Sequence, residues 1–432
     1  MRGNRTTVSC ALALVLTLGG TLTGCGGEGG GGSGGKVTLR FTWWGNPDRA
    51  ARTEQAVKLF EKRHPDIDIS TSFAGFDTYK AKLATQAAGG DAPDVMQLDY
   101  RQINQYSTSG ILLDLGKHPE LRTAEIDKRL LATGVVKGKR YAIPVARNTE
   151  TVAYDAALWR AAGVPEPTLD WTWDDWADAM LKLSKSKAKA VKGQAGSTDP
   201  GQSEDIFEVW LRGRGKSLYT HGGTRLGFTA DDLTRYWEWC TKLRKEGSVA
   251  PAEVTTQMDG SVETTALGLR KAVSSFNWDS AASGYQAIVG EGVRLAALPV
   301  DSSGRRGQYY KSSMFYGASA KTAHPKEAAR FIDFLLNDPE AGAILGASRG
   351  IPANGSLRER VLPKLGGFDK VVFDFQKQFE GKLDAPPKAP PKGDASLQTT
   401  FQRDYDQVSY ERMSPREAAE EYITEAKAEL RQ

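Results

Sequence analysis

The sequence predicts an α/β protein with two domains, and two observations carry this prediction. From residue 36 onward, stretches with the two-residue period of strands alternate with stretches of helical period, which is typical of an open and mainly parallel sheet. The chain also has 432 residues, and the roughly four hundred that follow its N-terminal leader exceed what one hydrophobic core usually serves. Beyond about residue 150 the pattern becomes largely helical.

The N-terminal leader has the features of a bacterial lipoprotein signal. An apolar run at residues 8–18 follows two arginines and is too short to cross a bilayer as a mature helix. It leads to LTGC at residues 22–25, which resembles a lipobox. We therefore expect a signal peptide at residues 1–24, a diacylglycerol on Cys25, and a glycine-rich tether over residues 25–35. A signal peptide that only happens to contain a cysteine is the alternative.

Composition limits the class of protein further. Cys10 leaves with the signal peptide and Cys25 carries the lipid, so Cys240 has no partner for an intramolecular disulfide. Cys240 lies on an apolar helical stripe, where we expect a small core residue. Loss of Arg2 and Arg5 lowers the formal charge from +4 to +2, which argues against a nucleic-acid partner. No other segment is apolar enough to span a membrane, so the protein is expected on the extracytoplasmic face of the cell membrane.

Two adjacent tryptophans, Trp43 and Trp44, lie where the first strand ends and the first helix is about to begin. Residues 37–44 alternate as a strand does, and Asn46 before a proline and an aspartate reads as a helix cap. Successive strand side chains point to opposite faces, so both rings cannot enter one core. Trp43 shares a face with the apolar residues of the strand, which leaves Trp44 for a ligand. A bulge at Gly45 could exchange these roles.

The next elements complete the sheet pattern. We expect a strand at 66–73, a helix at about 77–88 and a short apolar strand at 95–98. Ligands of such sheets bind outside the carboxyl ends of the strands. The tryptophan pair lies at one such end, and Asp99 and Tyr100 lie at another.

The later helices are marked by capping boxes, and none of the familiar catalytic motifs is present. Thr172 with Asp175, Thr229 with Asp232, and Ser414 with Glu417 each have the spacing of a helix start. The aspartate pairs at 174–175 and 231–232 are better explained as caps than as glycosidase carboxylates. The four histidines are scattered, and HExxH, GxSxG and CxxC are absent. We expect no enzyme activity, no metal and no cofactor.

Five sequence segments carry a resemblance to a known family. They read FTWWGNPDRAARTEQAVKLFEKRHPDIDI, GGDAPDVMQLDY, YDAALWRAAGVPEP followed by WTWDDW, FNWDSAASGYQA, and HPKEAARFIDFLLNDPEAGAILGASRGIPAN. In this order they resemble the extracellular solute-binding proteins of family 1, the carbohydrate-binding components of ABC importers. The resemblance covers nearly the whole mature chain but is not specific to one sugar.

The resemblance implies a periplasmic-binding-protein-like fold of two lobes whose hinge is crossed more than once. Lobe 1 would comprise residues 36–147 and 312–358, and lobe 2 residues 150–308 and 360–432. The expected function is that of a lipid-anchored monomer that captures a sugar, expected to be an oligosaccharide, between the lobes and delivers it to a membrane permease. A sugar-presenting partner of a membrane sensor and, less favoured, a carbohydrate-active enzyme remain the alternatives.

A sugar site needs flat aromatic rings for its C–H faces and polar groups for its hydroxyls. The candidate binding residues are Trp43, Trp44, Gly45, Asp99, Tyr100, Arg147, Asn148, Asp199, Trp278, Asp279, Tyr316 and Arg349. Some have other readings: Asp99 as a helix cap, Tyr316 as a core residue, and Arg147 in a hinge ion pair. Arg147 and Arg349, the latter expected in a turn at the cleft edge, hint weakly at an acidic sugar. The sugar's identity, length, linkage and charge stay open.

Overall fold

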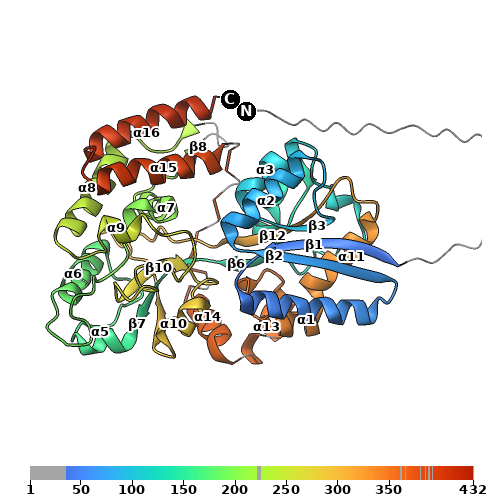
Figure 1. Cartoon of the computed structure of the whole chain (residues 1–432), viewed down its shortest axis with the longest axis horizontal. Helices are drawn as coiled ribbons and strands as arrows, with labels where there is room; N and C mark the ends of the chain where they lie inside the picture. The colour runs from blue at the N-terminus through green and yellow to red at the C-terminus, as the bar shows by residue number, and fades with distance from the viewer. Residues whose placement is uncertain are drawn as a thin grey trace, which may run out of the picture. The chain divides into compact units, whose positions relative to one another are not determined.

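The computed structural model describes residues 36–220, 225–360, 362–364, 366–379, 381–384, 386–387, 390–391 and 393–431 (Figure 1). Lys36–Gln432 forms one compact unit. The expected signal peptide, Cys25 and the tether lie outside the described residues. None of the described helices combines the length and the apolarity that a membrane span requires.

A six-stranded sheet forms the centre of the first lobe. In spatial order its strands are β13 (Ile351–Pro352), β6 (Ile143–Asn148), β12 (Lys311–Ala318), β3 (Val95–Leu98), β1 (Val37–Trp44) and β2 (Ile67–Ala74). β1 runs parallel to β2 and β3, whereas β12 is antiparallel to β3 and β6, and β13 is antiparallel to β6. The sheet is therefore mixed, and the expectation of a mainly parallel sheet was wrong. β12 enters after a long excursion through the second lobe, so no crossover helix ties its direction to that of β3.

Local signals explain why the first elements form where they do. β1 pairs along its whole length with β2, from Val37 opposite Ile67 to Trp44 opposite Ala74. The Asn46 side chain accepts a hydrogen bond from the backbone N–H of Arg49 at 2.9 Å, so it caps α1 as its position before a proline predicts.

A smaller antiparallel sheet forms the centre of the second lobe. Its order is β10 (Ser274–Trp278), β7 (Glu150–Asp155) and β11 (Val293–Ala296). Two short hairpins stand apart from both sheets: β4 (Val135–Val136) with β5 (Lys139–Arg140), and β8 (Tyr219–Thr220) with β9 (Arg225–Leu226).

Helices surround both sheets. Before residue 149 and between residues 311 and 360 they are α1 (Pro47–Arg63), α2 (Phe76–Ala88), α3 (Tyr100–Thr108), α4 (Lys128–Ala132), α11 (Pro325–Asn337), α12 (Pro339–Leu345) and α13 (Gly355–Arg360). Elsewhere they are α5 (Ala156–Ala161), α6 (Trp173–Ser184), α7 (Glu204–Gly213), α8 (Ala230–Lys245), α9 (Ala252–Thr255), α10 (Ser283–Val289), α14 (Gly367–Lys377), α15 (Asp394–Ser409) and α16 (Pro415–Glu429). Short 3-10 turns are η1 (Leu115–Lys117), η2 (Pro200–Gln202) and η4 (Leu362–Lys364).

Two large hydrophobic cores follow the two sheets. The first draws its buried residues from 39–146 and from 314–353, and the second from 152–309 and from 397–426. α15 and α16, drawn in red, lie against each other, and α16 packs against α8 (Figure 1). Cys240 on α8 is fully buried in the second core, as its apolar stripe predicts.

The chain passes between the two sheets more than once. β6 belongs to the six-stranded sheet and β7 to the small sheet, with Thr149 alone between them. The return at Tyr309 lies beside this first passage, because the Thr149 hydroxyl donates to the Tyr309 carbonyl at 2.7 Å. After α13 the chain leaves again, and α14 contacts β11 and α10 of the second lobe.

Candidate functional site

A lysine ammonium lies between two aromatic rings, one from each lobe. Lys311 Nζ is 3.7 Å from the centre of the Trp278 ring and 4.5 Å from the centre of the Tyr100 ring. Tyr100 follows β3, Trp278 ends β10, and Lys311 opens β12. Asp205 of α7 approaches the same ammonium to 3.7 Å. Both lobes thus contribute to one cluster of flat rings and charges.

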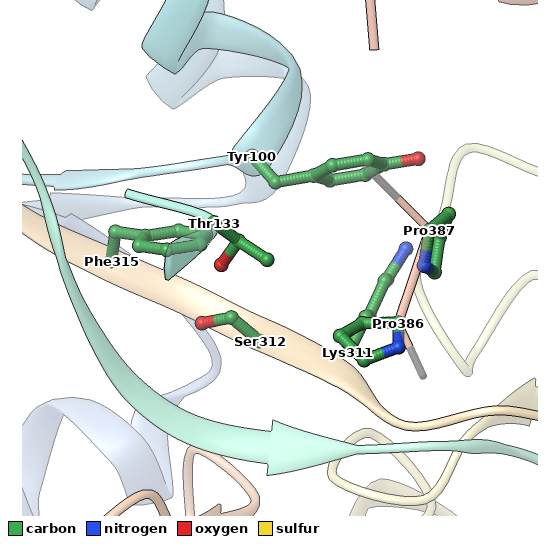
Figure 2. Close-up of a pocket in the computed structure, with 7 residues that line it drawn as sticks. All are labelled: Tyr100, Thr133, Lys311, Ser312, Phe315, Pro386 and Pro387. Carbon is green, nitrogen blue, oxygen red and sulfur yellow. The ribbon is translucent and has the colours of Figure 1, made fainter. Parts of the chain in front are cut away.

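A cavity opens beside this cluster. It is small and is lined by Tyr100, Thr133, Lys311, Ser312, Phe315, Pro386 and Pro387. Figure 2 shows the Lys311 side chain reaching toward the Tyr100 ring, with the two prolines beside it. The carboxyl end of β3 and the first residues of β12 therefore border the cavity, which is where a ligand of an open α/β sheet is expected.

Carboxyl groups outnumber the cations around the cavity. Arg101 donates from Nε to Asp394 at 2.8 Å and from Nη2 to Asp205 at 3.2 Å. Tyr309 donates to Glu208 at 2.7 Å, and Glu150 and Glu204 complete the group. In the described part of the chain, no three His, Cys, Asp or Glu side chains are placed to hold one metal ion.

Burial controls the protonation of these groups. Burial, and then the nearby charge of Asp205, raises the pKa of Glu150 well above its ordinary value. Burial and the charge of Asp394 do the same for the pKa of Glu204. For Asp205, burial also acts to raise the pKa, but the charges of Lys311 and Arg101 outweigh it and the pKa is lowered. Burial thus favours the neutral form of Glu150 and Glu204, whereas the two cations favour the charged form of Asp205.

Several buried oxygens on this side of the molecule accept no hydrogen bond from the described residues. They are Oδ1 of Asn148, Oε2 of Glu150, Oε2 of Glu204 and Oδ1 of Asp279, and the Glu204 oxygen has Nη2 of Arg101 at 3.7 Å. Each of these residues is at most 5% exposed. Oxygens of this kind can accept from the hydroxyl groups of a ligand or of water.

Comparison with known proteins identifies the family. The sequence profile of the bacterial extracellular solute-binding proteins matches residues 44–342. The chain belongs to this family. A solved extracellular solute-binding protein of family 1 from Alicyclobacillus acidocaldarius is 34% identical, with 92% of this chain and 99% of that chain aligned at a TM-score of 0.67. The resemblance seen in the sequence is thereby confirmed.

More distant relatives resemble this chain in fold or in sequence. A periplasmic oligogalacturonide-binding protein from Yersinia enterocolitica, solved with digalacturonic acid, is 20% identical with a TM-score of 0.81 and aligns over 92% of this chain and 99% of that chain. An uncharacterised lipoprotein from Streptomyces antibioticus is 31% identical over 42% of this chain, but only 40% of its own length is matched. The maltodextrin-binding protein MdxE of Bacillus subtilis is 24% identical, with 77% of both chains covered.

Within this solute-binding protein, four of the candidate residues meet at the hinge. The backbone N–H of Thr149 donates to Asp279, and Asn148 donates to Ser280 at 3.2 Å. The Arg147 guanidinium lies 4.4 Å above the Tyr310 ring and donates to Gln376 of α14 at 3.0 Å. Arg147 therefore contacts the Gln376 amide and the Tyr310 ring in place of the ion-pair partner that was expected at the hinge. The ring of Trp278 is adjacent to this group along the chain.

The structure corrects the interpretation of the tryptophan pair. Trp43 is fully buried and Trp44 is 9% exposed, so neither presents an open ring face. Trp44 packs against Phe76 and Tyr79 of α2, while the opposite face of β1 packs beneath α11 through Phe41 and Phe331. Helices cover both faces of the sheet, so strand alternation did not require either ring to face a ligand.

Asp99 and Gly45 have local roles at strand ends. Asp99 forms a capping box with Gln102 at the start of α3, which confirms its alternative reading as a helix cap. Gly45 follows β1, and a Cβ there would lie 2.5 Å from the Arg49 side chain. Glycine leaves room for that arginine.

Asp199 is a structural residue of the second core, and its expected place in a sugar site was wrong. It accepts hydrogen bonds from Tyr405 at 2.8 and 2.9 Å and from the Gly201 N–H at 2.9 Å, and it pairs with Arg244 at 3.2 Å. Its side chain is 0% exposed. The sequence could not show that Arg244 and Tyr405, far along the chain, hold this carboxylate together with the nearby Gly201 N–H.

Tyr316 and Arg349 also lie inside the protein. Tyr316 is fully buried with its ring against Phe41, which confirms the core reading. Arg349 is 3% exposed and donates to Gln97 at 3.1 Å and to Thr53 at 2.8 Å, so its expected position at the cleft edge was wrong. The segment that carries it folds under α1 rather than over the cleft.

Sequence reasoning missed several charged members of the site. Lys311 opens the strand that returns to the first sheet, and no local motif marks it. Glu208 was detectable, because it is a carboxylate within the apolar stretch IFEVW of α7. Arg101 and Asp205 looked like ordinary residues of helical first turns and acquire their roles only through contacts across the lobes.

Proposed function

We propose that this protein is the sugar-binding component of an ABC importer and that its ligand binds between the lobes, at Tyr100 and Trp278. The observation that supports this most is that the two rings hold a cation at 4.5 and 3.7 Å while buried oxygens nearby accept no hydrogen bond from the described residues. Flat rings suit the C–H faces of a sugar, and unpaired acceptors suit its hydroxyls. Lys311 would have to leave the rings when a sugar enters.

The relatives support a saccharide as ligand. Several of them are named as binding proteins for oligogalacturonide, maltodextrin and diacetylchitobiose. Around the proposed site, carboxyl groups exceed Arg101 and Lys311, and Arg147 and Arg349 are engaged elsewhere. We therefore favour a neutral oligosaccharide over an acidic one at this site.

The lobe boundaries belong to the same proposal. Lobe 1 is taken as residues 36–147 with 312–358, and lobe 2 as residues 150–308 with 360–432. The separation of the two cores near residues 149 and 311 supports this division.

The cellular setting is proposed from the leader and the relatives. Residues 1–24 would be removed and Cys25 lipidated, with residues 25–35 as a tether at the extracytoplasmic face. A relative from Streptomyces antibioticus is described as a lipoprotein, which supports this. The partner would be a permease, engaged by a monomer; a membrane sensor is the alternative partner.

A glycan screen tests the proposal. The mature protein is mixed with a panel of neutral and acidic oligosaccharides, and its melting temperature is measured. A ligand at a hundred times its Kd adds roughly 2.7 kcal/mol to the free energy of unfolding. The melting temperature should then rise by several degrees. At least one neutral oligosaccharide should raise the melting temperature without being chemically changed. No stabilisation by any glycan, or release of a product, would contradict a binding function.

A further inference from the structure

Two buried arginines lie side by side in the first lobe without a carboxylate. Arg49 donates from Nε to the Ser348 carbonyl at 2.8 Å and from Nη1 to the Trp44 carbonyl at 3.2 Å. Arg349 donates to the Gln97 amide oxygen and the Thr53 hydroxyl. Within the described part of the chain, neither guanidinium forms an ion pair, although they are only 8% and 3% exposed.

The surroundings of this arginine pair add positive rather than negative potential. Burial and the charge of Arg349 lower the pKa of Arg49 to about 9, and burial also lowers the pKa of Arg349. Asp48 is the carboxylate that acts on Arg49, but it is exposed and pairs with Arg52 at 3.0 Å. Arg49 also lies in the first turn of α1, at the positive end of the helix dipole.

The polar groups next to the pair are neutral and can donate to an anion. The Tyr316 hydroxyl lies close enough to Arg349 to act as a hydrogen-bond partner. The Ser348 hydroxyl is buried and has no hydrogen-bond partner among the described residues. Both hydroxyls can donate a proton as well as accept one, and neither carries a negative charge that would neutralise the arginines.

The location is the carboxyl end of the parallel strands. Gln97 of β3 and Tyr316 of β12 are register partners, and Gln97 also donates to the Trp44 carbonyl at the end of β1. This edge of a sheet, beside a helix N-terminus, is where α/β proteins bind anions. A buried cation without a counter-charge costs several kcal/mol, so two of them need an explanation.

We propose that Arg49 and Arg349 bind one small anion, a halide or a carboxylate group, inside the first lobe. The anion accepts from Nη1 of Arg349 and neutralises the pair. It also ties α1 to the segment at residues 348–350, which leads into β13 beside the hinge residue Arg147. The anion is a free ion from solution, because Arg349 lies inside the lobe and not at the cleft edge.

Anion titration of the mature protein tests this. The protein is transferred to a methanesulfonate buffer of fixed ionic strength, and chloride, bromide or acetate replaces methanesulfonate in steps. The melting temperature should rise by several degrees and saturate. Arg349→Met should abolish the saturable rise, whereas the control Arg122→Met should keep it, because Arg122 already pairs with Asp333 at 2.7 Å. A linear response of the same size in wild type and Arg349→Met would overturn the proposal.

A further measurement guards against a misfolded variant. A bromide-soaked crystal of the wild type should show an anomalous peak between the two guanidiniums. No peak together with no response to any of these anions overturns the proposal. Neutral-glycan binding is measured separately, so failure of the sugar proposal would leave this result intact.

Discussion

Trp43 and Trp44 are buried on opposite faces of one strand because helices cover both faces of the large sheet. Trp43 stacks on Phe73 with ring centres 5.9 Å apart, and Trp44 packs against Phe76 and Tyr79. Replacing either tryptophan by alanine should therefore lower the free energy of unfolding by about 3 to 5 kcal/mol. Denaturant titration measures this, with Tyr410→Ala as a control, since that ring is 44% exposed and lies after α15, outside the first core. A Trp44→Ala variant as stable as the wild type would contradict the packing.

Asp279 gives the hinge a predictable response to pH. Burial raises its pKa to about 7, although hydrogen bonds from Gln376 and Thr149 act in the opposite direction. Between pH 4 and 7 the folded protein holds a proton on Asp279 that the unfolded chain has released, so stability falls as the pH rises through this range. The Asp279→Asn variant cannot release that proton, and its stability should fall less steeply.

Thermal unfolding at a series of pH values between 4 and 8 measures this difference. Other buried carboxyls, Glu150 and Glu204 among them, contribute in the same direction, so the slope should decrease but not vanish. The exposed Asp77→Asn variant serves as the control and should follow the wild type. Equal slopes in wild type and Asp279→Asn would contradict a raised pKa.

At the scale of elements, the helix starts and strand bounds that depend on neighbouring residues were predicted correctly. The capping boxes at Thr172, Thr229 and Ser414 are all present, because each cap depends on residues three positions apart. The strand at 95–98 also has the predicted bounds. Three predictions were wrong because they depended on segments far apart in the sequence. The sheet is not mainly parallel, because β12 returns antiparallel. Asp199 pairs with Arg244, and Trp44 is covered by α2.

The Thr229 cap offers a test at this scale. Its hydroxyl accepts from the Asp232 N–H at 3.3 Å, and Asp232 also holds Lys216 at 2.6 Å. Thr229→Ala should lower the free energy of unfolding by about 1 kcal/mol, because it exposes the first turn of α8. Thr424→Ala, in the exposed middle of α16, is the control and should change it by less than about 0.5 kcal/mol. Denaturant titration gives the free energy of unfolding of both variants. An equal decrease in Thr229→Ala and Thr424→Ala would contradict a stabilising cap at Thr229.

At the scale of the whole molecule, the chain's repeated passage between two sheets brings Tyr100, Trp278 and Lys311 together. No one segment contains the site. The resemblance in sequence implied the two-lobe fold and made Tyr100 and Trp278 candidates for the proposed site, but Lys311 depends on how β12 returns after some 160 residues in the other lobe. The cluster of carboxyls around it is likewise assembled from α7, α15 and β7.

The most direct test is the affinity of the identified glycan, measured by calorimetry for the wild type, Tyr100→Ala, Trp278→Ala and the control Tyr410→Ala. Tyr410 is 44% exposed and follows α15, apart from the proposed site. Loss of a stacking ring costs about 1 to 3 kcal/mol, so Tyr100→Ala and Trp278→Ala should each bind roughly ten- to a hundredfold more weakly and remain folded. Tyr410→Ala should bind as the wild type does. Wild-type affinity in both ring variants would contradict a sugar site between Tyr100 and Trp278.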